Sequence, residues 1–199
     1  MLILGKLQNM KNIIFIIFIG LIISSCVSID SRSNELSKNQ QRFIEGKPYV
    51  FAVTSSYNSE KDKFPIKDLG RYFYLYEKNG KYIRITPKFS SQVLIAEMLD
   101  ENKKVIDEHK LKLLPYSQEN LDKSRESKTL YFNNKYEILK KSNHSVTDLG
   151  QSWMYYTALT FLDKNGNLVI TEKTTDLGLI FLIPVGGKSV SSNIFNKVE

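Results

Sequence analysis

The sequence predicts a mainly β fold: an antiparallel β-sandwich or open barrel built from sequential hairpins, with at most one or two short helices. Runs of β-branched and aromatic residues recur along the chain, and such residues favour strands. Turn segments rich in Asn, Asp and Gly separate these runs. Beyond the N-terminal region a single segment has the features of a helix, so we expect roughly eight to ten strands in one domain.

The clearest hairpin signal joins residues 72–76 to residues 82–86. Asn79-Gly80 lies between them and suits the two positive-φ positions of a type I′ turn, whose twist matches that of paired strands. This pairing would place the following side chains on one face, which we expect to be the core side: Tyr72, Tyr74, Tyr76, Ile83 and Ile85.

Further strands and one helix are predicted from the same signals. The apolar run at residues 179–183 is too short to cross a bilayer and is expected to form a central strand. Residues 186–189 are expected to form a β-turn before the C-terminal tail, and residues 117–126 a surface helix or an ordered loop. The remaining strands are expected at residues 48–54, 93–99, 129–132, 135–139 and 177–184, with others starting at 105 and 168 and one running through 153–162.

The N-terminal residues have a different character. Residues 10–26 begin with Met10 and the positively charged Lys11, continue through an apolar run at 13–23 and end in small residues before the chain's one cysteine. This pattern resembles the signal peptide of bacterial lipoproteins, with Ile23, Ser24, Ser25 and Cys26 matching the lipobox. An eleven-residue run is shorter than the roughly 17 to 25 residues of a spanning helix, so a secretory signal fits better than a membrane span. A short buried core helix is the alternative.

The lipoprotein resemblance implies a domain plan. Residues 1–25 would be the signal peptide, with Met10 as a candidate for the true start of translation. Cys26 would become the mature N-terminus, carrying a diacylglyceryl thioether and usually a third, amide-linked chain. Two or three acyl chains attach a protein firmly to a bilayer. Residues 26–42 are expected to be a flexible polar tether, and residues 43–199 a single β-rich domain.

Composition narrows the class of partner. Removing residues 1–25 takes away Lys6 and Lys11 and no acid, which leaves 26 basic and 21 acidic residues, a net charge of +5. The lysines are interspersed with acids, a pattern of solvated surface, so no nucleic-acid partner is expected, although attraction to anionic lipid headgroups stays open. The abundance of Lys, Ile and Asn is similar to that of lipoproteins from spirochaetes and other AT-rich bacteria.

No catalytic residue, metal site or cofactor is expected. The chain has two histidines, His109 and His144, without the repeated spacing that a zinc site needs. His144 lies in the Ser- and Asp-containing segment 142–148, but neighbours in sequence do not form a triad, so a polar loop is expected. The acidic turn at 163–167 lacks the later glutamate of a calcium loop.

Aromatic residues are the remaining candidates for a binding site. Exposed on a sheet, they could stack on sugars or anchor a protein partner, whereas packed against each other they would belong to the core. The candidates are Tyr72, Tyr74, Tyr76, Tyr82, Trp153, Tyr155 and Tyr156.

These observations predict a lipid-anchored bacterial envelope protein, not an enzyme, whose β-domain binds a macromolecule at the cell surface or in the periplasm. The membrane would be contacted through the N-terminal lipid, and a protein or a glycan is the expected partner. The alternative is a carrier of a small lipid or sugar, or an enzyme whose site is dispersed over the β-domain.

Overall fold

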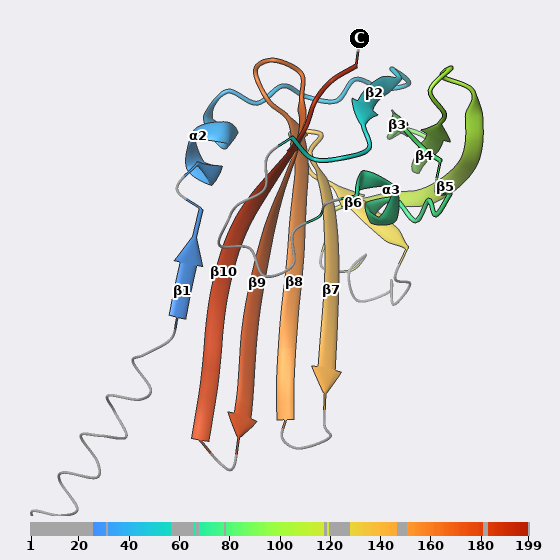
Figure 1. The fold of residues 1–199 in the computed structure, drawn as a ribbon. Helices are drawn as coiled ribbons and strands as arrows, with labels where there is room; N and C mark the ends of the chain where they lie inside the picture. The colour runs from blue at the N-terminus through green and yellow to red at the C-terminus, as the bar shows by residue number, and fades with distance from the viewer. Residues whose placement is uncertain are drawn as a thin grey trace, which may run out of the picture.

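The computed structural model is mainly β, as predicted: its ten strands form one sheet in the order β1-β10-β9-β8-β7-β6-β5-β4-β3-β2 within the described residues (Figure 1). The structure describes residues 26–30, 32–56, 66, 68–77, 79–117, 119, 128–146, 151–180 and 183–198. The strands are β1 (Cys26–Ile29), β2 (Tyr49–Ala52), β3 (Tyr82–Lys88), β4 (Val93–Leu99), β5 (Val105–Pro115), β6 (Thr129–Phe132), β7 (Ile138–Val146), β8 (Gln151–Leu162), β9 (Leu168–Ile180) and β10 (Ile183–Phe195). The two short helices are α2 (Ser33–Lys38) and α3 (Leu69–Tyr72).

Sequential antiparallel hairpins dominate the sheet, because most neighbouring strands in space are also neighbours in the chain. The β3-β4-β5 and β6-β7-β8-β9-β10 runs are antiparallel, while β1 pairs with β10 and β5 with β6 in parallel. The strands predicted at 93–99 and 129–132 coincide with β4 and β6.

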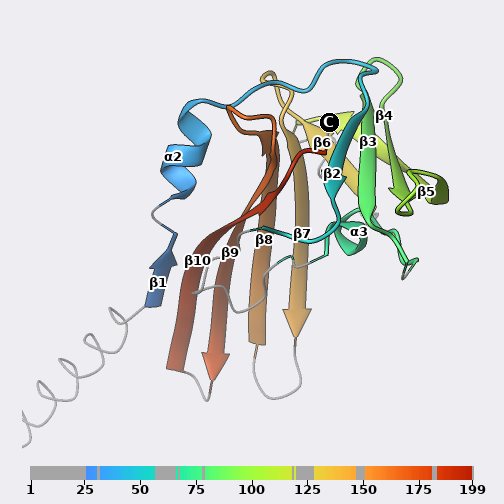
Figure 2. The same ribbon diagram turned by 45° about the horizontal axis from the view of Figure 1, so that its top comes forward.

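The sheet curves over itself so that β2 to β5 lie across one end of the long strands β7 to β10 (Figure 2). Side chains from both halves meet in one core, which includes Phe51, Ile83, Ile85, Leu94, Leu113, Leu130, Ile170 and Phe195. The sheet is not closed into a barrel. Its two halves do meet at the chain's C-terminus, where Ala52 N–H donates to the Asn196 carbonyl at 2.9 Å and Val198 N–H to the Val50 carbonyl at 2.8 Å.

The hairpin predicted at residues 72–86 is wrong. Residues 69–72 form α3, which the Asp68 side chain caps by accepting from Gly70 N–H at 2.8 Å. Tyr74 then adopts a φ of 62°, a left-handed conformation that a strand does not contain. Asn79-Gly80 precedes β3, which pairs with β2 and β4 instead of with residues 72–76.

Gly80 packs closely against a neighbouring side chain and does not form a hairpin turn. A Cβ atom at this position would lie 2.2 Å from Met98 Sδ and 2.3 Å from Met98 Cγ. Gly70 makes a similar approach, since its Cβ would lie 2.5 Å from the Met98 terminal methyl. The Met98 side chain therefore fills the space over both glycines.

Two predictions near the C-terminus are also wrong. The apolar run at 179–183 is not one central strand, because β9 ends at Ile180, which pairs with Ile183 at the start of β10. Residues 186–189, predicted as a turn, lie inside β10.

The prediction of a polar loop at residues 142–148 is wrong as well. The described part of this segment is strand as far as Val146, the end of β7.

The segment predicted as a flexible tether, residues 26–42, contains β1 and α2. Strand β1 pairs with the edge of β10, and Gln41 N–H donates to the Leu162 carbonyl at 2.8 Å. Residues 1–25, predicted to be a signal peptide, and most of the helix or loop predicted at 117–126 lie outside the described residues.

Neither helix in the described part of the chain is long and apolar enough to cross a membrane.

Candidate binding face on the long strands

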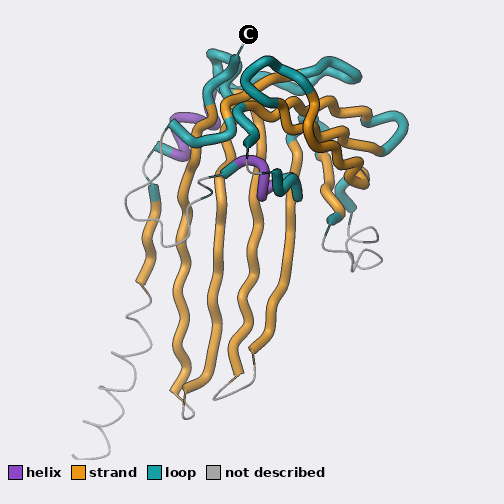
Figure 3. The backbone as a smooth tube through the Cα atoms, turned by 45° about the vertical axis from the view of Figure 1, so that its right-hand side comes forward, coloured by secondary structure: helices purple, strands orange, loops and turns teal. Residues whose placement is uncertain are grey.

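Strands β7 to β10 continue well beyond the loops and helices that surround the core (Figure 3). Alternate residues of a strand point to opposite faces of its sheet. Ala158, Thr160 and Leu162 are buried on the face that β2 to β5 cover, which we call the inner face. The opposite face, the outer face, carries the odd-numbered residues of β8.

Three large apolar side chains lie together on the outer face, away from the core. Trp153 is directly opposite Leu177 in the β8–β9 ladder, and Tyr155 is two residues further along β8. Residues opposite each other in a ladder share a face, with Cβ atoms about 5 Å apart. Trp153, Tyr155 and Leu177 are 40%, 46% and 50% exposed, so this part of the sheet presents apolar surface to its surroundings.

Lysines flank these three residues on the same face. Lys188 is opposite Thr175, which in turn is opposite Tyr155, and Lys173 is opposite Thr157. Both lysines are exposed, and neither forms an ion pair with a carboxylate of the described residues. We call Trp153, Tyr155, Leu177, Lys173 and Lys188 the outer patch.

Charge is divided between the two faces of these strands. The acidic residues of β7 to β10 are Glu172 and Asp176, and their even positions in β9 place both on the inner face. The outer face carries Lys141 together with Lys173 and Lys188. The outer face is therefore positive as well as partly apolar.

The candidate lipidation residue lies at the same level of the sheet. Cys26, the first residue of β1, pairs with Gly187, which pairs with Asp176, which pairs with Met154. With strands about 4.8 Å apart, three spacings put the Cys26 and Met154 backbones roughly 14 Å apart. Trp153 directly precedes Met154, so Cys26 begins its strand beside the outer patch. Ile23, Ser24 and Ser25 lie outside the described residues.

The other aromatic candidates have separate environments. Tyr72 is buried, with its hydroxyl 2.9 Å from Thr160 Oγ1, and burial raises the pKa of the Tyr72 phenol. Tyr74 and Tyr82 are half-buried, whereas Tyr76 is 68% exposed. Tyr156 is half-buried on the inner face of β8. The structure thus brings together only Trp153 and Tyr155 among these candidates on an exposed sheet face.

Sequence reasoning missed Lys140, which lies under α3 on the inner face. Its Nζ donates to the Tyr72 carbonyl at 3.1 Å and lies 4.8 and 4.2 Å from the ring centroids of Tyr72 and Tyr74. Burial lowers the pKa of Lys140 to about 8, and the Glu172 carboxylate acts in the opposite direction. Its position two residues after the apolar Ile138, on the same face of a strand, is the sequence signal that could have located it.

Glu172 is the acidic centre of the inner face. The Tyr156 hydroxyl donates to Glu172 Oε1 at 2.6 Å, and Asn193 Nδ2 donates to Oε2 at 3.1 Å. Both carboxylate oxygens are thereby used to hold neighbouring strands together. These contacts account for the burial of an acid at this position.

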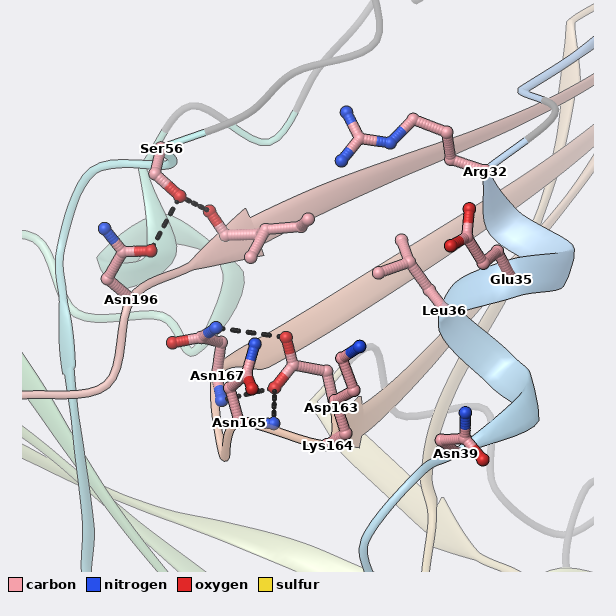
Figure 4. A pocket seen from close by; sticks show the side chains of 11 residues that line it. Arg32, Glu35, Leu36, Asn39, Ser56, Asp163, Lys164, Asn165, Asn167 and Asn196 are labelled. Atoms are coloured by element: carbon pink, nitrogen blue, oxygen red, sulfur yellow. Dashed lines mark hydrogen bonds between the residues drawn. The ribbon is translucent and has the colours of Figure 1, made fainter.

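A cavity of about 420 Å³ lies between α2 and the β8–β9 turn (Figure 4). Its lining is polar, and much of it already serves the fold. Asp163 Oδ1 accepts from the backbone N–H of Asn165 at 2.8 Å and of Asn167 at 2.9 Å, which closes the turn. Asn196 Oδ1 accepts from the Ser56 hydroxyl at 2.9 Å.

His109 does not line this cavity: it is half-buried on β5, with its Nδ1 3.3 Å from the Tyr74 carbonyl. The side chain of His144 lies outside the described part of the structure.

Comparisons with models of known families, with curated proteins and with solved structures find no match to this chain.

Proposed function

We propose that this chain is an exported lipoprotein of the bacterial cell envelope, anchored by acyl chains at Cys26, whose β-domain is a binding module and not an enzyme. The lipobox resemblance of residues 23–26 supports the anchor. The observation that carries the binding role is the outer patch, an exposed aromatic and basic surface beside the strand that begins at Cys26.

The chemistry of the patch favours binding over catalysis. Trp and Tyr side chains offer large, rigid contact surfaces with a polar edge, which is why they dominate binding energies at interfaces. Lysine ammonium groups add attraction for an anionic partner. The patch residues include no acid–base pair of the kind that proton transfer requires.

Metabolic labelling with palmitate tests the anchor. The native protein should incorporate the label and Cys26→Ala should not, because the chain has no other cysteine. A labelled Cys26→Ala variant, or an unlabelled native protein, would contradict lipidation at this residue.

Site-specific photo-crosslinking in intact cells tests the binding role. A photoreactive residue at Tyr155 should give an adduct, whereas one at Tyr136 should not. Tyr136 is a matched control because its 40% exposure is close to the 46% of Tyr155, but it lies in the turn between β6 and β7. Equal adducts at both positions, or none at either, would argue against a binding role for the outer patch.

A further inference from the structure

We infer that the outer patch binds the anionic headgroup region of the membrane to which Cys26 is anchored, so that the β-domain lies against the bilayer and does not stand away from it. This inference rests on the proposed function and names the partner of the same surface. It follows from the chemistry of the patch, from its charge and from its distance to the anchor.

The side-chain types of the patch suit a membrane interface. Trp and Tyr concentrate at the headgroup level of bilayers, where the ring lies in apolar surroundings and the N–H or O–H stays hydrated. Leu177, directly opposite Trp153, adds aliphatic surface at the same level. Lysines bury their methylene stems and extend the ammonium group toward phosphates.

The charge of the face is complementary to an anionic membrane. The acids of β7 to β10, Glu172 and Asp176, are on the inner face, so they do not oppose the lysines of the outer face. Each lysine close to an anionic surface strengthens binding by a factor of roughly five. Two exposed lysines, Lys173 and Lys188, are attractive but too few to hold a protein on a membrane alone.

The anchor supplies the remaining attachment. Acyl chains at Cys26 would enter the bilayer roughly 14 Å from the Met154 backbone, because only β9 and β10 separate β1 from β8. The two or three acyl chains attach the protein firmly by themselves, and the basic patch adds a second membrane signal on the same molecule. Four described residues of β1 and their ladder with β10 fix the patch close to the anchor.

Trp153 makes the inference directly measurable, since it is the only tryptophan of the chain. The lipidated protein is reconstituted into vesicles of phosphatidylcholine alone and of phosphatidylcholine mixed with phosphatidylglycerol. In the anionic vesicles we expect Trp153 emission to shift to shorter wavelength and to be quenched by lipids brominated near the headgroup. Emission identical to that of the protein in solution, with full access to acrylamide, would overturn the inference.

A second experiment tests the outer patch in a protein without the acyl anchor. The mature chain of residues 26–199 carrying Cys26→Ser contains every described element, and circular dichroism verifies that it folds. Sedimentation should show weak, salt-sensitive binding of this variant to phosphatidylglycerol vesicles. The binding constant should fall roughly thirtyfold in Lys173→Gln/Lys188→Gln. It should stay unchanged in the control Lys88→Gln/Lys112→Gln, which replaces two exposed lysines on β3 and β5.

The two experiments distinguish failure of the proposed anchor from failure of the proposed membrane contact. A native protein without acyl chains contradicts the proposed anchor, while the second experiment still tests the patch. Equal loss in both lysine pairs contradicts a specific role for the patch. A photo-adduct of protein mass at Tyr155, in place of a lipid adduct, would show that the patch binds a protein and would also overturn the inference.

Discussion

Lys140 should make the free energy of unfolding of the β-domain depend on pH in the alkaline range. Its ammonium group is protonated in both the folded and the unfolded chain below about pH 8, and burial of that charge opposes folding. Between pH 8 and its ordinary pKa of 10.5, the folded chain loses the proton while the unfolded chain keeps it. Stability therefore rises with pH in this window, and the full gain is present above pH 10.5. Linkage between these two pKa values gives an increase of about 2 kcal/mol between pH 7 and pH 9.5.

Urea denaturation of the native protein and of Lys140→Met across this range measures the effect, and urea is used because a salt denaturant would screen charge. The difference in unfolding free energy between the two proteins should move by about 2 kcal/mol in favour of the native protein as the pH rises. Lys141→Met is the control for net charge, since Lys141 donates to the Tyr116 hydroxyl on the outer face. A pH-independent difference between the native protein and Lys140→Met would refute the reasoning. It would show that the contacts with the Tyr72 and Tyr74 rings compensate fully for burial.

Two further predictions concern the region around α3. Tyr72→Phe should destabilise the protein by about 1 to 3 kcal/mol because it leaves the buried Thr160 hydroxyl unpaired. Tyr76→Phe should change the unfolding free energy by less than about 0.5 kcal/mol, because Tyr76 is exposed. Chemical denaturation of both variants checks this, and equal effects would contradict the placement of these tyrosines. Gly80→Ala should cost about 1 to 3 kcal/mol through overpacking against Met98, and the cost should shrink when Met98→Ala is also present. Additive effects in that double-mutant cycle would mean that the two side chains do not clash.

Local patterning was enough to predict strands whose partners are close in the chain. In β4 (Val93–Leu99), residues 93–98 alternate between half-buried and buried positions, and the strand has the predicted bounds. The acidic turn after Leu162 also separates strands as predicted. The turn after Phe132 is longer than predicted, since it extends to Glu137, and the strand expected at 135–139 begins only at Ile138. These signals are local because each hairpin is closed by its own turn.

The hairpin at residues 72–86 could not be predicted correctly from composition. Tyr, Phe and Leu suit a strand, yet Tyr72, Phe73 and Leu75 are all buried, a pattern without the period of two that a half-buried strand shows. A helix of four residues is too short to produce its own periodicity. Asp68, the helix cap, was the available signal.

Contacts between residues far apart in the sequence explain why the pairing of the N-terminal strand and the exposure of the outer patch could not be predicted. Cys26 pairs with Gly187, and no property of residues 26–42 alone indicates this partner. The aromatic candidates were identified from sequence, but their exposure depends on which face of β8 lies against β2 to β5. That choice of face is set by the folding of the whole sheet, and it leaves Trp153 and Tyr155 outside the core.

The most direct test of the proposed function is the mass of the N-terminal peptide, from protein purified out of the membranes of its native host. The account predicts a peptide that begins at Cys26 and carries a diacylglyceryl group on sulfur. A peptide that extends upstream of residue 26, or one with an unmodified Cys26 thiol, would contradict it.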